Sequence, residues 1–258
     1  MTCDIRIHYY LSLPDLKGYY DPWCCYMKIL HIAGWSGSGK TTFIRKLLPF
    51  LSVHGKTGTI KHICSHYSVL PPGKDTSIHF EAGSNPSVGI DNEKTIAYFH
   101  CTDLETTMDM LSDSGVRYAV IEGYKNYPFQ KILIGDLEVD YLLKNPAVDE
   151  VIPVLDQFDD WYTLSGLSRE LITQYPGSFL LTWTGYTDNY LSAFRLCSDI
   201  EQEFSRHRDV CGIRIRVHRW VKNNLFPVYM VMAYTNTGGS LLPDILNQLY
   251  PCISDRVS

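Results

Sequence analysis

The chain has 258 residues, of which 45% are hydrophobic, and its formal net charge is −5. This length is enough for one large or two small domains with their own cores. The mildly acidic balance argues against a nucleic-acid partner, and no apolar run is long enough to span a membrane. The first residues also lack the basic and apolar segments of a secretory signal, so none is predicted.

The eight cysteines form no CxxC pair, and their spacing suggests no disulfide framework. Reduced thiols in a cytoplasmic protein are therefore expected. Residues 1–26 differ from the rest of the chain, because they carry five tyrosines and a tryptophan without a clear period. Met27 resembles a native start directly before the first predicted strand. Residues 1–26 are thus either an N-terminal extension or an ordered arm that packs its aromatic side chains on the domain.

Residues 34–41 read Gly-Trp-Ser-Gly-Ser-Gly-Lys-Thr, between an apolar strand predicted over 29–33 and a helical pattern from Thr42. This is the phosphate loop (P-loop) of nucleoside triphosphatases in its strand–loop–helix setting. The glycines let successive N–H groups point at a phosphate, and the helix adds the positive end of its dipole. Lys40 is expected to reach the β- and γ-phosphates, and the Thr41 hydroxyl to bind Mg²⁺. The predicted phosphate-binding residues are Gly34, Ser36, Gly37, Ser38, Gly39, Lys40, Thr41 and Thr42.

The helix after the loop has one apolar face, formed by Phe43, Ile44, Leu47, Leu48 and Leu51. Pro49 is predicted to kink or interrupt this helix, and Gly55 to end it.

The next strand, predicted over 57–60, ends in Lys61 and His62. Ligands of an open parallel sheet lie at the carboxyl ends of its strands, so both residues are expected on the rim of the P-loop. His62, Cys64 and His66 alternate and form either a soft-metal or oxyanion site or a polar rim loop with an incidental thiol. Three ligands without a fourth favour the polar loop.

Two further places suit a nucleotide site. Residues 71–76 are a predicted loop in which Lys74 and Asp75 either meet a phosphate and its metal or form a solvated turn with a helix cap. The apolar strand over 116–121 ends in Glu122, where a carboxylate would lie near the water shell of the metal.

These motifs, in this order, resemble the molybdopterin-guanine dinucleotide biosynthesis protein B (MobB) family over about residues 27–136. The matching motifs are Gly34 to Thr42, Lys61-His62, Pro72-Gly73-Lys74-Asp75, Ala82-Gly83, Glu122-Gly123-Tyr124-Lys125 and Lys131-Ile132. The chain departs from the family in two places. The family often has a second histidine and an aspartate after Lys-His, where this chain reads Ile63-Cys64-Ser65-His66-Tyr67-Ser68-Val69, and it has serine where this chain has Thr76.

The resemblance implies a GTP-binding accessory protein in the maturation of molybdenum or tungsten pterin cofactors, with weak Mg²⁺-dependent GTPase activity. It also implies a homodimer that acts with a molybdopterin guanylyltransferase, a molybdopterin synthase, or both, and with their pterin cofactor. By position, Lys40 and Thr41 hold phosphate and Mg²⁺, and Glu122 is the acidic strand tip. The catalytic residues predicted in this way are Lys40, Glu122 and Asp75, the further nucleotide-binding residues are Lys61 and Lys74, and the metal ligands are Thr41 and Glu122.

The pattern changes after about residue 155, where Asp156, Asp159 and Asp160 form an acidic join that looks flexible. Strands are predicted over 178–183, 213–217 and 228–233, with a turn at Asn223-Asn224. Two helices are predicted, one carrying Leu191, Phe194, Cys197, Ile200 and Phe204 and a last one carrying Leu241, Leu242, Ile245, Leu246 and Leu249, with Pro243 in its first turn. The order β-α-β-β-α indicates a small α+β domain.

This half is similar, more faintly, to the large subunit of molybdopterin synthase (MoaE), through residues 212–219. The lysines that serve sulfur transfer in that enzyme are not found, which implies a degenerate domain that holds a pterin or a partner without catalysis. Arg214, Arg216 and Arg219 either meet the pterin phosphate or form the solvated face of a strand, and alternating charges favour the solvated face.

The predicted fold is therefore α/β, a P-loop type and mostly parallel sheet with flanking helices, followed by a small α+β domain. The predicted domains are an extension over 1–26, a P-loop domain over 27–155 and a MoaE-like domain over 160–258. Two other functions fit the loop: a small-molecule kinase, and a scaffold in which the nucleotide is structural. No base-specificity motif of the NKxD type is present in the sequence, so GTP rests on the resemblance alone.

Overall fold

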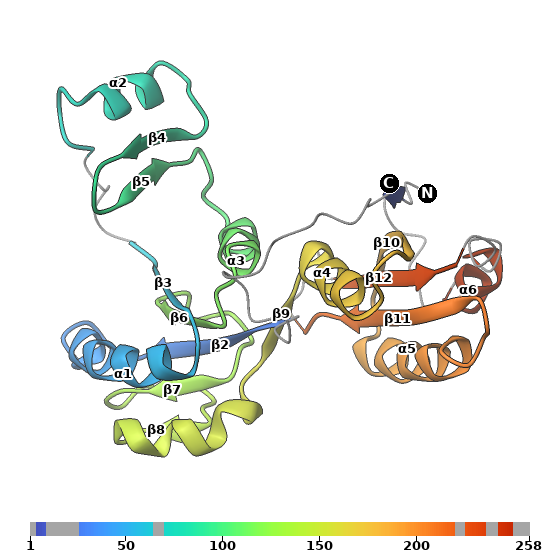
Figure 1. Cartoon of the computed structure of the whole chain (residues 1–258). Coiled ribbons are helices and arrows are strands. Elements are labelled where there is room, and N and C mark those ends of the chain that lie inside the picture. Colours follow the sequence, from blue (N-terminus) through green and yellow to red (C-terminus); the bar gives the residue numbers. More distant parts are fainter. Residues whose placement is uncertain (1–3, 9–25, 64–69, 220–224, 236–241, 250–258) are drawn as a thin grey trace.

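The computed structural model describes residues 4–8, 26–63, 70–219, 225–235 and 242–249. It contains two larger sheets, each covered by helices, and a small hairpin unit that stands apart from both (Figure 1). Within these residues, no helix combines the length and the hydropathy of a membrane span.

The first sheet is mostly parallel, as predicted, with the strand order β3-β6-β2-β7-β8. The short β9 pairs antiparallel with the beginning of β2. Parallel register sets Glu122 of β6 opposite both Ile32 of β2 and Lys61 of β3, so these carboxyl ends meet at one edge. The strands are β2 (Tyr26–Ala33), β3 (Thr57–Lys61), β6 (Tyr118–Glu122), β7 (Lys131–Leu133), β8 (Leu143–Lys144) and β9 (Asp160–Tyr162).

Helices cover both faces of this sheet because the side chains of β2 alternate between two cores. Leu30 packs with α1 (Lys40–His54) and with the short 3₁₀ helices η1 (Val148–Glu150) and η2 (Ile152–Gln157). Ile29 packs on the opposite face with α3 (Leu104–Asp113).

Helix α1 buries the apolar face predicted for it and ends at Gly55, as expected. Of the two effects predicted for Pro49, the interruption is wrong, because α1 continues through it to His54, and the kink stays a prediction. Proline removes one N–H, which leaves the carbonyl of Arg45 without its helical donor. Arg45 and Pro49 are both exposed, so water can supply the missing hydrogen bond.

The hairpin unit consists of α2 (Asp75–Glu81) and the antiparallel pair β4 (Ser87–Ile90) and β5 (Thr95–Tyr98). In Figure 1 it projects beyond β3, away from α1.

The second sheet is antiparallel, with the order β1-β10-β12-β11. Its strands are β1 (Asp4–His8), β10 (Phe179–Thr187), β11 (Val210–Val217) and β12 (Phe226–Tyr234). Helices α5 (Tyr190–Phe204) and α6 (Leu242–Leu249) pack on one face, and α4 (Leu164–Gln174) packs on the other. The predicted order β-α-β-β-α is confirmed as β10-α5-β11-β12-α6, with Pro243 in the first turn of α6. The predicted turn at Asn223-Asn224 and Leu241 lie outside the described residues.

Two features of this half differ from the prediction. Helix α4 was not predicted, and Leu191 and Phe194 of α5 do not belong to the core, since they are 67% and 55% exposed. The apolar face of α5 is instead centred on Ala193, Cys197 and Ile200.

The acidic join is ordered rather than flexible, because two of its three acids are bound by residues of β2 and of the segment directly before β7. Asp160 pairs with Lys28 of β2 at 2.8 Å, and Asp159 Oδ2 accepts a hydrogen bond from the backbone N–H of Gln130 at 2.6 Å. Between them and α4, Trp161 is buried in the core under α3. Residues 160–162 thus complete the first sheet, although they were assigned to the second domain; the domain boundaries otherwise stay a prediction.

One segment of the leader is an ordered strand, since β1 pairs antiparallel with β10 in a register that sets Ile5 opposite Trp183. The remaining leader residues up to 25, with most of the aromatic side chains, lie outside the described residues.

Candidate functional site

The chain turns sharply between β2 and α1, and glycines make this turn possible. A Cβ atom on Gly34 would lie 2.2 Å from the carbonyl oxygen of Ile134 on the neighbouring strand end, so no larger residue fits. Gly39 is left-handed, with φ +96°, and caps α1, and its carbonyl accepts the first helical hydrogen bond, from Phe43. The loop therefore delivers the first turn of α1 to the edge of the sheet.

Lys40 holds its ammonium group over the loop itself. Its Nζ donates to the carbonyl oxygens of Gly34 at 3.1 Å and Trp35 at 2.6 Å. Burial lowers the pKa of Lys40; the Glu122 carboxylate opposes this shift, and the charges of Lys125 and Lys61 add to it. These couplings place the Glu122 carboxylate and the ammonium groups of Lys61 and Lys125 within electrostatic reach of Lys40.

The acidic strand tip lies at the same edge. Glu122 Oε1 is 3.5 Å from Lys61 Nζ, and the backbone carbonyl of Glu122 accepts a hydrogen bond from His62. Below it, the fully buried His31 contacts the carbonyl oxygen of Gly123 through Nε2 at 2.6 Å. Burial lowers the pKa of His31 from 6.5 to about 4, so His31 is neutral at pH 7. It supports the strand tip without adding charge to it.

This geometry fits a bound phosphate. Ser38 Oγ is buried and has no hydrogen-bond partner within the described structure. Ser36, Gly37, Gly39, Thr41 and Thr42, the other predicted contacts, are exposed at the loop and at the first turn of α1. Helix N–H groups there lack intrahelical acceptors, and the helix dipole favours an anion. Hydroxyl and carboxylate oxygens are also the ligands that Mg²⁺ prefers.

Some predicted residues are not gathered at this edge. Lys74 and Asp75 lie at the start of α2, in the projecting unit, and Figure 1 draws α2 well away from α1. Their contact with a nucleotide stays a prediction. His62 stacks on Tyr124 with ring centroids 4.2 Å apart, whereas Cys64 and His66 lie outside the described residues. No group of histidines, cysteines and acids that could hold a metal ion occurs in the described part of the chain.

A second loop borders the P-loop and was missed from the sequence. The Trp35 indole N–H donates to the carbonyl of Asp136 at 3.0 Å, and the Asp136 carboxylate pairs with Lys144 at 2.7 Å. Asn145 Oδ1 accepts a hydrogen bond from the backbone N–H of Gly135 at 2.6 Å, which joins the ends of β7 and β8. Nothing in the spacing of these residues distinguishes them from an ordinary polar turn.

A cavity of about 500 Å³ lies where the two larger sheets meet. Aromatic and charged side chains line it, among them Tyr162, Tyr190, Phe194, Glu201, Arg216 and Arg219. Arg216 Nη1 is 2.6 Å from Glu201 and its guanidinium lies over the Tyr162 ring, whereas Arg219 pairs with Asp159 at 3.4 Å. The charges on this lining are thus largely paired with each other.

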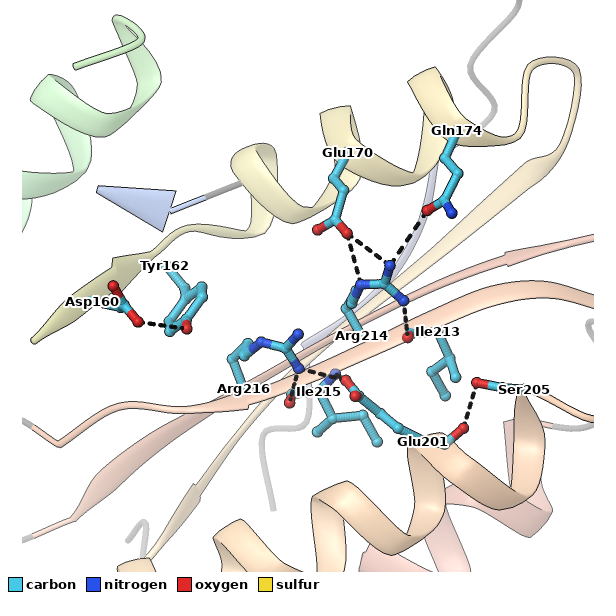
Figure 2. A network of polar contacts seen from close by, with 10 residues as sticks. All are labelled: Asp160, Tyr162, Glu170, Gln174, Glu201, Ser205, Ile213, Arg214, Ile215 and Arg216. Carbon is cyan, nitrogen blue, oxygen red and sulfur yellow. Dashed lines mark hydrogen bonds and ion pairs between the residues drawn. The ribbon is translucent and has the colours of Figure 1, made fainter. Parts of the chain in front are cut away.

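Figure 2 shows how the strand arginines are held. Arg214 points to α4, where it pairs with Glu170 at 2.8 Å and contacts Gln174. Glu201 of α5 binds both Arg216 and the backbone N–H of Ile215. Arg214, Arg216 and Arg219 were predicted either to meet a pterin phosphate or to form a solvated strand face. All three have protein partners, and only Arg216 and Arg219 line the cavity.

Comparison with known proteins identifies the P-loop half. The family described as Molybdopterin guanine dinucleotide synthesis protein B (MobB) matches residues 29–155. The Molybdopterin-guanine dinucleotide biosynthesis adapter protein of Haemophilus influenzae is 33% identical over 129 residues, which cover 48% of this chain and 71% of that protein. The chain belongs to the MobB family.

A second curated relative agrees with MobB membership. The adapter protein of the same name from Escherichia coli is 31% identical over 113 residues, covering 41% of this chain and 64% of its own length. The crystal structure of Bacillus subtilis MobB covers 46% of this chain and 77% of its own, with 23% identity and a TM-score of 0.39. The MobB match ends before β9, so the likeness of the C-terminal half to MoaE stays a prediction.

Proposed function

We propose that this chain binds GTP and Mg²⁺ at the P-loop and acts as an accessory protein in the biosynthesis of molybdopterin guanine dinucleotide, with weak GTPase activity. The observation that carries the proposal is the convergence of Lys40, Glu122 and Lys61 at one sheet edge, beside a loop in which Gly34 leaves no room for a larger residue. Membership of the MobB family supports the pathway.

In this proposal the chain works by positioning and charge. Lys40 exchanges its two loop carbonyls for phosphate oxygens, which form stronger charge-assisted hydrogen bonds. The backbone N–H groups of the loop hold the phosphates in one orientation, so little covalent chemistry is needed. Thr41 and Glu122 would hold Mg²⁺, which neutralises phosphate charge when it is bound.

The partners follow from the same proposal. Relatives of this chain are named adapter proteins, which supports an action through another enzyme. We propose a molybdopterin guanylyltransferase, a molybdopterin synthase, or both, with a homodimer of this chain as the working form.

The test is an equilibrium titration of the whole chain with Mg-GTP and with Mg-ATP, in parallel with Lys40→Ala. Saturable GTP binding that the variant loses supports the proposal. A strong preference for ATP would contradict the GTP assignment, and equal binding by Lys40→Ala would remove the P-loop from the site.

The cavity between the sheets favours a second candidate function, a scaffold in which the C-terminal half recruits a pterin. Cavities of this size suit small-molecule ligands, and the aromatic lining suits a flat heterocycle. Cofactor maturation in cells is the assay, with Phe194→Asp compared with Leu191→Asp. Both residues are exposed on α5, but Phe194 lines the cavity and Leu191 is not among its lining residues. Equal amounts of matured cofactor with the two variants would contradict the scaffold function.

A further inference from the structure

The turn after Glu122 has an unusual backbone that determines where the next side chains lie. Gly123 and Tyr124 both have positive φ, +107° and +48°. A Cβ atom on Gly123 would lie 2.5 Å from Cβ of His62, so only glycine fits there. Left-handed backbone in a residue such as Tyr124 persists only where its surroundings hold it, and such residues cluster at functional sites.

The surroundings that hold Tyr124 are aromatic rings. The His62 ring stacks on it at 4.2 Å with an interplanar angle of 14°, and Tyr127 packs edge-on at 5.4 Å. Since His62 directly follows β3 and Tyr124 follows β6, the stack joins the ends of two neighbouring strands. The turn is therefore held from the rim of the nucleotide site.

This turn presents Lys125 to the P-loop. The Lys125 ammonium lies 4.5 Å from the centre of the Trp35 ring, and Trp35 is itself a residue of the loop, 58% exposed. Lys61, by contrast, is paired with Glu122. Within the described residues the structure records no ion pair for Lys125, so its charge rests on an aromatic face alone. A cation–π contact at an exposed site is weak compared with a charge-assisted bond to phosphate.

We propose that Lys125 is a catalytic residue of the GTPase reaction, a cation supplied by the same chain that leaves the Trp35 ring to contact the γ-phosphate. The inference rests on the proposed function and adds a residue to that site. The charge of Lys125 also lowers the pKa of Lys40, which agrees with this placement because the two ammonium groups are then within electrostatic reach of each other.

The reaction defines what Lys125 does. The oxygen of a water molecule forms a bond to the γ-phosphorus, and the bond from that phosphorus to the bridging oxygen breaks. GDP leaves with the electron pair, and the proton released by the water ends on inorganic phosphate or in solvent. Negative charge redistributes over the γ-oxygens and the bridging oxygen in the transition state. A cation aimed there stabilises the transition state more than the bound substrate, which is the condition for catalysis.

The experiment compares the wild-type chain with Lys125→Met, Lys125→Arg and Lys46→Met, the last a control on the exposed face of α1. Two quantities are measured for each: the single-turnover rate of Mg-GTP hydrolysis, and the affinity for Mg-GDP with and without aluminium fluoride, which mimics the transferring phosphoryl group. Unchanged GDP affinity in a variant shows that its site is folded.

Lys125→Met is expected to hydrolyse GTP roughly 100-fold more slowly, within the range seen when one stabilising donor is removed. Aluminium fluoride increases the affinity for GDP, and this increase should fall by a similar factor in Lys125→Met. The affinity for GDP alone should stay within about twofold, because Lys125 is expected to contact only the transferring phosphoryl group. Lys125→Arg should recover most of the rate, and Lys46→Met should match the wild type.

Two failures are distinguishable. If wild-type chain binds no Mg-GTP, the proposed function falls and the role of Lys125 falls with it. If nucleotide binds but Lys125→Met keeps both the wild-type rate and the aluminium fluoride effect, only the role of Lys125 is overturned. The affinity measurement decides the question even where hydrolysis is too slow to follow.

Discussion

His218, which lies where the two larger sheets meet, should make the fold less stable in acid. This histidine is 2% exposed, and the rings of Trp161, Tyr162 and Tyr229 surround it at centroid distances of 5.0, 6.0 and 5.0 Å. Burial lowers its pKa from 6.5 to about 3. Between these two values the unfolded chain binds a proton that the folded chain does not, so stability is full above pH 6.5 and falls as the pH drops toward 3.

The size of the effect follows from the shift. One pKa unit corresponds to about 1.36 kcal/mol, so lowering the pH from 7 to 5 should cost about 2 kcal/mol through His218. His31, with its pKa lowered to about 4, adds a loss of about the same size. Asp109 opposes both, because burial raises its pKa to about 6 and its neutral form suits the fold. Asp109 should therefore raise the free energy of unfolding by about 1.4 kcal/mol between pH 7 and pH 5.

The assay is urea unfolding at pH 7 and at pH 5, followed by circular dichroism. His218→Phe keeps a ring of similar size in the aromatic cage but cannot titrate, and His54→Phe serves as an exposed control. The difference in unfolding free energy between the two pH values should shrink by about 2 kcal/mol in His218→Phe alone. An unchanged difference in that variant would refute the reasoning, whatever its absolute stability.

Three more predictions concern the P-loop. Lys40→Ala should weaken Mg-GTP binding by about 10- to 150-fold, the worth of a hydrogen bond to a charged group, and equal affinity in a calorimetric titration would contradict it. Glu122→Gln should keep nucleotide affinity but slow single-turnover hydrolysis by roughly 100-fold; an unaltered rate would remove Glu122 from the site. Gly34→Ala should lose about 1–3 kcal/mol or more of stability, since its Cβ would lie 2.2 Å from the carbonyl oxygen of Ile134. Thermal unfolding measures that loss, and a wild-type melting temperature would argue against the crowding.

The part of the site that could be predicted from sequence is the part that depends on local pattern. An apolar strand, a glycine loop and a helix adjacent in the chain must meet, and parallel register then brings Lys61 and Glu122 to the edge where that loop lies. The same holds for the second half of the chain, where the alternation of apolar and charged residues predicted that Ile213 and Ile215 face the core. Period and strand order are properties of short segments, which a sequence displays directly.

Prediction failed where a distant partner decided the outcome. The acidic join reads as flexible until Lys28 and Gln130, both far away in the chain, bind its carboxylates. Leu191 and Phe194 continue a helical spacing, yet they lie outside the face of α5 that is buried, which Ala193, Cys197 and Ile200 form. Helix α4 did have a local signal, since Thr163 caps it and Leu167 and Leu171 share one face, but the change of pattern at the join obscured it.

Lys125 illustrates the same limit at the site itself. The sequence Glu-Gly-Tyr-Lys places a lysine three residues after the acid. In a regular strand or helix, this spacing alone would determine the direction of the lysine side chain. The observed direction depends on the left-handed turn at Gly123 and Tyr124, which exists because His62, from another strand, stacks on the tyrosine ring.

Removing that stack should therefore impair hydrolysis even though His62 itself touches no phosphate in the proposal. His62→Ala is expected to keep Mg-GDP affinity within about twofold and to lose part of the rate that Lys125→Met loses, and the double variant should be no slower than Lys125→Met alone. Additive losses in the double variant would show that His62 acts by some route other than placing Lys125.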